Sequence, residues 1–269
     1  MRKFTISNDV YIKNKLHTFN IYNYIIISLL PIMVLNIYNN IDNLWYLLLS
    51  ILLGLTSKLL LNDKYTLNIK EIIINSLIIN LLIVNVSNIM IFIISNLIIY
   101  CLHILLIKNK IKINTLLLGI FIYYLLDKII NLNDINIISY YLDNYIYLGM
   151  IIFSYLLLII KKCVKRNIVI TSSFIYLIIS LVLILTNNIE IKNIFNPYVL
   201  IIILYVIGNL ETSPLNNKVR YMYGIIIGLL LSLIPIINNL IIILIILFIT
   251  NLIIKYLDKI FIYKSVKLV

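Results

Sequence analysis

The chain has 269 residues, of which 63% are hydrophobic and 12% are charged, and its mean hydropathy is +1.09. A soluble domain carries about twice that charged fraction, and so few polar side chains could not cover its surface. The composition therefore excludes a soluble globular protein and indicates an integral membrane protein.

The apolar residues fall into ten runs separated by polar breaks. A transmembrane helix needs roughly 20 apolar residues, and sometimes as few as about 17, and nearly every run is long enough to cross. In chain order, the predicted spans cover residues 21–38, 44–61, 69–84, 87–107, 112–126, 145–160, 168–186, 194–208, 221–236 and 238–254. We predict an all-α, polytopic protein with one integral membrane domain: an arm at 1–20, a ten-helix bundle at 21–254 and a tail at 255–269.

The basic residues indicate how this bundle is oriented. All of the 22 lysines and arginines except Lys128 and Lys192 fall on one side of the predicted topology, whereas the ten acidic residues divide evenly. Enrichment of Lys and Arg on the cytoplasmic side is the positive-inside pattern. We therefore expect both termini in the cytoplasm and read the net charge of +12 as a signal of orientation, not of nucleic-acid binding. The first run, from near Ile21, is too long for a cleavable signal peptide.

Few residues within the spans carry a recognisable chemistry. Cys101 and Cys163 fall at or near the cytoplasmic side, where thiols stay reduced, and two cysteines alone cannot hold an iron–sulfur cluster. His103 lies near the cytoplasmic end of the fourth span, as either a proton-relay or a packing residue. Asparagines within spans, such as Asn80, are either polar contacts between helices or a product of the strong Ile, Leu, Asn, Lys and Tyr bias.

The motifs of autonomous enzymes are absent from the sequence. It has no G-x-G-x-x-G or Walker loop, no paired-Asp motif for prenyl diphosphates and no Ser/His/Asp arrangement. A hydrolase or a nucleotide-binding enzyme is therefore not predicted.

Residues 209–228, NLETSPLNNKVRYMYGIIIG, form a polar turn followed by two glycines. Pro214 suits a turn or the first position of a helix, and Thr212 and Ser213 are expected to cap backbone amides beside it. Gly224 and Gly228 form a G-x-x-x-G pattern, which lets the backbone of another helix approach closely.

This segment also resembles a signature of the NqrB/RnfD family, whose members are membrane subunits of the sodium-pumping NADH:quinone reductase and of Rnf-type electron-transport complexes. That signature is D-P-V-T-S-P followed by an aromatic residue with Gly and by a second Gly. The matching residues are Thr212, Ser213, Pro214, Tyr223, Gly224 and Gly228, while Asn209 stands in place of the Asp and Val219 in place of a Gly. KIKINTLLLGIF is similar to the family's N-P-x-N-P-A-M-x-G, matched at Asn114 and Gly119. The N-terminal arm and first span, the basic link LIIKKCVKRNIVI and the last span also look like those of the family.

The resemblance implies FMN as a cofactor, joined by a phosphodiester to a Thr of an S-x-A-T motif in the external region after the fifth span. Residues 127–144 contain no Thr, and Ser139 is their one aliphatic hydroxyl. We therefore expect that the attachment Thr, and with it the covalent flavin, has been lost, with Ser139 as the only substitute anchor.

The family resemblance implies a membrane subunit of an ion-translocating oxidoreductase complex in a bacterial-type inner membrane, inactive as an isolated chain. Its partners would be the lipid bilayer and the other subunits, which carry flavins and iron–sulfur centres. Two alternatives stay open. One is a permease of unknown substrate, expected to show matched breaks in its two halves, although Pro31, Pro197, Pro214 and Pro235 show no such pairing. The other is a relict scaffold subunit without electron transfer.

Overall fold

The computed structural model describes residues 15–61, 68–83, 86, 88–108, 114–131, 145–186, 196–210, 212–234 and 240–266. Within these ranges every regular element is a helix and no strand occurs. The all-α prediction is confirmed for this part of the chain. Ser139 lies outside the described residues.

Each of the ten predicted spans overlaps a helical segment in these ranges. The segments are α1 (Lys15–Asn39), α2 (Asp42–Leu61), α3 (Ile69–Leu82), α4 (Ile89–Lys108), α5 (Thr115–Asn131), α7 (Tyr145–Ile160), α8 (Arg166–Leu185), α9 (Pro197–Ile201) continued by η2 (Ile202–Ile207), α10 (Asn217–Ser232) and α11 (Leu240–Val266). The largest difference is at α11, which continues without a break through most of the predicted tail.

Four helices of the described residues are long and apolar enough to cross a membrane. They cover Asn20–Asn39, Asp42–Leu60, Ile89–Leu106 and Arg166–Leu185. α2 shows the distribution that suits lipid, because Leu52 and Leu59 are 59% and 76% exposed while Ser50 and Ser57 are buried. Each of these two serine hydroxyls donates to the carbonyl three residues earlier, so that it needs no outside partner. Such helices suggest a membrane protein.

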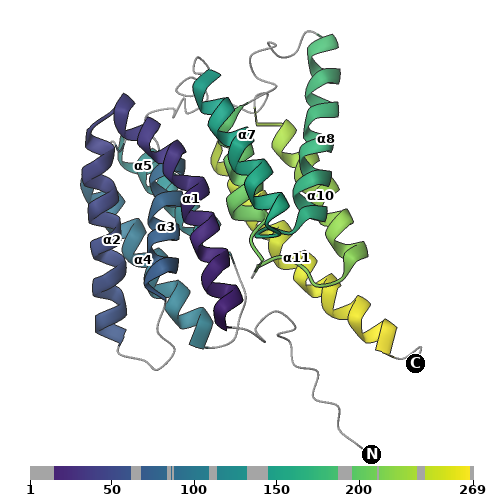
Figure 1. Cartoon of the computed structure of the whole chain (residues 1–269), viewed down its shortest axis with the longest axis horizontal. Helices are drawn as coiled ribbons and strands as arrows, with labels where there is room; N and C mark the ends of the chain where they lie inside the picture. Colours follow the sequence, from purple (N-terminus) through teal and green to yellow (C-terminus); the bar gives the residue numbers. More distant parts are fainter. Residues whose placement is uncertain are drawn as a thin grey trace, which may run out of the picture.

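In the described residues the helical segments form two sets of five that follow one another in the chain, with α9 and η2 counted as one segment. In Figure 1, α1 to α5 lie together on one side of the molecule and α7 to α11 on the other. The sets meet where α1 packs against α7 and where α5 packs against α11. The first helix of one set thus contacts the first helix of the other, and the two last helices do the same.

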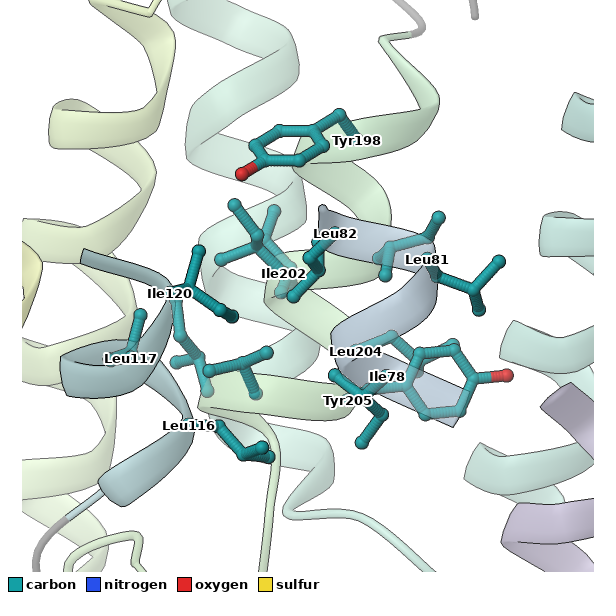
Figure 2. Close-up of a cluster of buried hydrophobic side chains, with 14 of the residues drawn as sticks. Ile78, Leu81, Leu82, Leu116, Leu117, Ile120, Tyr198, Ile202, Leu204 and Tyr205 are labelled. Atoms are coloured by element: carbon teal, nitrogen blue, oxygen red, sulfur yellow. The ribbon is translucent and has the colours of Figure 1, made fainter. Parts of the chain in front are cut away.

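The third helix of each set is short and buried. α3 has 14 residues, and α9 and η2 together replace a full span with segments of 5 and 6 residues. All residues from Ile201 to Ile207 are buried. Figure 2 shows the side chains of Ile78 and Leu82 of α3 in one cluster with Ile202 of η2 and Leu117 of α5. A helix that is apolar on all sides is expected in such a central position.

Local sequence determines how these two central helices begin and how the second one winds. At α3, the backbone N–H of Asn68 donates to the Glu71 carboxylate at 3.2 Å, one half of a capping box. At α9, the Asn196 side chain accepts from the N–H of Tyr198 at 3.0 Å and Pro197 follows as the first helical residue. η2 has wide turns in which hydrogen bonds span five residues, as between Gly208 N and the carbonyl oxygen five residues earlier, at 2.9 Å.

Candidate functional site at the start of α10

The polar turn of the sequence forms a corner between η2 and α10, which we define as residues Thr212 to Asn216. The predicted capping residues are wrong. Asn216 is the residue that caps α10, because its side-chain oxygen accepts from the N–H of Lys218 at 2.9 Å. Ser213 instead donates to the carbonyl oxygen of Leu210 at 3.4 Å. The Thr212 hydroxyl is buried without a hydrogen-bond partner among the described residues.

The physical reason for this difference is an acceptor from another helix. Asp258 of α11 accepts from the N–H of Leu215 at 2.7 Å and from the N–H of Asn216 at 2.8 Å, one with each carboxylate oxygen. These amides are the groups that a cap at Thr212 or Ser213 would otherwise satisfy. A carboxylate close to a helix N-terminus is also favoured by the helix dipole.

Arg220 secures the other side of the corner. Its Nε donates to the carbonyl oxygen of Pro214 at 2.9 Å, and its Nη1 donates to the Asn217 side chain at 2.7 Å. The corner is therefore held from two sides, by Asp258 on its amides and by Arg220 on its carbonyl. The sequence interpretation missed both roles. The sequence does contain a signal for the role of Asp258, because it is the single acidic residue between 240 and 266.

The two glycines of α10 lie against α8, as the G-x-x-x-G pattern predicts. A Cβ at Gly224 would meet the Thr171 hydroxyl, and one at Gly228 would lie 2.7 Å from the carbonyl oxygen of Ser172 and 2.8 Å from Cβ of Ile175. Close approach of another helix is therefore confirmed, and α8 is that helix. Between the glycines and the corner, Tyr223 is buried and its hydroxyl accepts from the Asn251 side chain of α11 at 3.0 Å.

The second motif segment meets η2 at the end nearer the corner. The side-chain amide of Asn114 donates to the carbonyl oxygen of Val206 at 2.8 Å, and its oxygen accepts from the N–H of Leu117 at 3.3 Å as the cap of α5. Gly119 lies against α4, because a Cβ there would collide with the side chain of Ile99. Asn114 and the residues that lead into the corner are thus brought together.

The basic link also reaches the end of η2. The N–H of Lys165, just before α8, donates to the carbonyl oxygen of Gly208 at 3.0 Å. Gly208 has no room for a side chain, since a Cβ would lie 2.7 Å from the carbonyl oxygen of Leu204 and from the side chain of Val169. Two segments that are distant in the sequence, at Asn114 and at Lys165, therefore converge on the end of η2.

Other residues singled out in the sequence lie elsewhere. His103 Nδ1 lies 3.0 Å from the Thr115 hydroxyl, between α4 and α5, and the two cysteines are free thiols. Burial raises the pKa of the Cys163 thiol to about 11, although the nearby Lys161 charge opposes the change. Across the described ranges, no group of three or more His, Cys, Asp or Glu residues could hold a metal ion.

Comparisons with protein-family models, with curated proteins and with solved structures give no match for this chain. The interactions around the corner are helix caps and hydrogen bonds to the backbone. In the described residues they bring no nucleophile together with a base. Such an arrangement can position helices and transmit motion between them.

Proposed function

We propose that the chain is a membrane subunit of an Rnf-type ion-translocating oxidoreductase complex in a bacterial-type inner membrane. In this proposal the ten helical segments are ten membrane crossings and both termini are cytoplasmic. Electron transfer takes place on partner subunits, and the chain takes part in coupling it to cation transport. In complexes of this kind the cofactor carries the redox chemistry and the protein positions it.

The contact between Asn114 and Val206 carries this proposal. The family resemblance rests on two segments, one containing Asn114 and Gly119 and one containing Thr212, Ser213 and Pro214. The contact spans 92 residues and joins the first segment to the helix that leads into the second. The two segments that carry the resemblance therefore lie at one place in the fold, which is what a shared family site requires.

The arrangement of the chain ends supports the proposed topology. α1 begins and α11 ends at the lower side of the molecule in Figure 1. An even number of crossings places both ends of a bundle on the same side, and the distribution of Lys and Arg favours the cytoplasm for that side.

For the cofactor, we propose that the covalent FMN of the family is absent from this chain. The support is chemical: a phosphoester needs a hydroxyl acceptor, and residues 127–144 offer no Thr and only Ser139. If the complex still transfers electrons, the remaining flavins and iron–sulfur centres then lie on its other subunits.

One observation favours a permease as the second candidate. Transporters with two structural repeats often place short or interrupted helices in corresponding positions of the two halves. Here the third helix of each set, α3 and α9 with η2, is short and buried, and residues of both lie in one hydrophobic cluster. The prolines alone gave no sign of this correspondence.

Purification of the full-length chain from its native membrane separates these functions. The complex is solubilised in mild detergent, its subunits are identified by mass spectrometry, and a denaturing gel is inspected for flavin fluorescence. We expect co-purifying subunits with flavin and iron–sulfur centres, and no fluorescence on this chain. Recovery of the chain as a lone polypeptide would contradict the complex and favour the permease.

Two further outcomes refine the result. Flavin fluorescence on this chain would contradict the loss of the tether, and a Ser139→Ala variant then tests the one substitute anchor, since its fluorescence should disappear. Co-purifying subunits that reduce no artificial electron acceptor would support the relict scaffold instead of an active pump.

A further inference from the structure

α10 and α11 are joined by polar contacts at two points in one antiparallel register. The Asn251 side chain donates to the Tyr223 hydroxyl at 3.0 Å, and the Asp258 carboxylate accepts from the N–H of Asn216 at 2.8 Å. Between the two points, the chain runs forward by seven residues from Asn251 to Asp258 and back by seven residues from Tyr223 to Asn216. Seven residues correspond to about 10 Å along an α-helix. Equal steps on both helices mean that neither can slide along the other without breaking both contacts.

Asp258 is the part of this joint that lies beyond the predicted last span. Its side chain is 7% exposed, and both carboxylate oxygens accept a backbone N–H. It is the single acidic residue in a stretch that also contains Lys255, Lys259 and Lys264. A buried carboxylate is costly unless it is hydrogen-bonded, so the corner and Asp258 satisfy each other.

Two other residues of this extension of α11 face away from the bundle, while Leu257 is partly buried against the core. Tyr256 and Ile260, on the opposite face of the helix from Asp258, are 69% and 41% exposed, whereas Ile254 and Leu247, on the same face as Asp258, are buried. Asp258 therefore holds the extension to the start of α10. On its far side α10 is packed against α8 at Gly224 and Gly228, with no room for adjustment.

We propose that Asp258 is a positioning residue that couples the extension of α11, residues 255–266, to the corner at the start of α10. A displacement of the extension is transmitted through the carboxylate to Leu215 and Asn216, and from there to the first turn of α10. The inference does not depend on the proposed redox function, because it requires only the folded chain. A failed search for redox subunits would leave it intact.

Hydrogen exchange of the chain in lipid nanodiscs, followed by mass spectrometry, tests the hydrogen bonds between Asp258 and the corner. In Asp258→Asn, one carboxylate oxygen is replaced by an amide that faces a backbone donor. We expect exchange at Leu215 and Asn216 to accelerate at least tenfold, with exchange around Gly228 unchanged. Thr250→Ala is the matched control on the same helix, because the Thr250 hydroxyl donates to the carbonyl oxygen of Leu247 within α11. This substitution should leave the corner unaffected.

Asp258→Glu keeps a carboxylate and should restore most of the protection, an outcome that a purely steric role of this position would not produce. It also serves as the test protein if the Asn variant does not fold. For the coupling itself, spin labels at positions 215 and 256, both exposed in the native chain, report the distance between corner and extension. Its distribution should broaden in Asp258→Asn and stay narrow in Asp258→Glu. Unchanged exchange at 215 and 216, an equal acceleration along all of α10, or an unchanged distance distribution would overturn the proposal.

Discussion

The side-chain amide of Asn114 donates a hydrogen bond of 2.8 Å to the carbonyl oxygen of Val206. This bond joins the start of α5, in the first set of helices, to η2, in the second set. Asn114 is 3% exposed, so that no water replaces the bond when it is lost. It is a direct polar link between the two halves of the molecule.

Replacing Asn114 should therefore destabilise the fold. Asn114→Ala removes the bond to Val206 and the cap on Leu117, and we expect a loss of about 1–2 kcal/mol in the free energy of unfolding. Unfolding in mixed micelles, with a rising fraction of a denaturing detergent, measures this free energy. Asn39→Ala, at an exposed position at the end of α1, is the control. A loss no larger than that of the control would contradict the role of Asn114.

The contact between α8 and α10 gives a second prediction. Gly228→Ala places a methyl group against the backbone oxygen of Ser172, which cannot move aside as a side chain could. We expect a loss of about 1–3 kcal/mol in the free energy of unfolding. Gly149→Ala is a matched control on α7, because a Cβ there has no atom within 4 Å. That control should be neutral or stabilising by up to about 1 kcal/mol, and equal effects of the two substitutions would refute the tight contact.

Lys162 predicts a stabilising substitution. It lies two residues after the last residue of α7, with φ of 57° in the left-handed region, and the N–H of Cys163 donates to the carbonyl oxygen of Leu158 at 2.9 Å. This is the helix end that normally carries glycine. Lys162→Gly should raise the free energy of unfolding by up to about 1 kcal/mol, and Lys162→Val should lower it by a similar amount. Thermal unfolding of the three proteins in one detergent checks the order, and a reversed order would be inconsistent with this conformation.

The Cys163 thiol predicts a pH dependence. Burial raises its pKa from the ordinary 9.0 to about 11, against the opposing effect of Lys161. The folded chain thus favours the neutral thiol. The contribution of this group to stability is complete below pH 9.0 and is lost as the pH rises through about 11.

The alkylation rate measures this titration directly, because only the thiolate reacts. In a Cys101→Ser variant, the rate at Cys163 should stay low at pH 8 and increase up to about pH 11. The same peptide in denaturant is the control and should titrate near the ordinary value. Coincident profiles for the folded and the denatured protein would rule out the shift.

The sequence was sufficient to predict the helices, because each long apolar run has few alternatives in a membrane. It also predicted the close approach at Gly224 and Gly228, which depends only on residue size and spacing. The contacts between distant segments could not be predicted, and the sequence analysis assigned no role to Asp258. The partners of Asn80 could not be predicted either. Its side-chain oxygen accepts from Asn36 at 3.3 Å, and its amide donates to the backbone oxygen of Asn43 at 3.0 Å.

Ser213 and Thr212 illustrate the limit for local rules. Both are good capping residues, and their position beside Pro214 favoured that role. The amides they would cap are taken by a carboxylate more than 40 residues away, with separations of 43 and 42. The capping preference of Ser and Thr was overridden because the Asp258 carboxylate of another helix forms stronger, charge-assisted hydrogen bonds with these amides.

The wide winding of η2 has a consequence for how the chain tolerates changes in length. Each hydrogen bond across five residues closes a loop with one more residue than the corresponding bond of an α-helix. Deleting a single residue between 202 and 207 would let the segment tighten into ordinary helical winding while the turns on either side keep their facing. In most buried helices the same deletion would rotate every following side chain by about 100°. The η2 segment is therefore the place in this part of the fold where loss of one residue should disturb the neighbouring turns least.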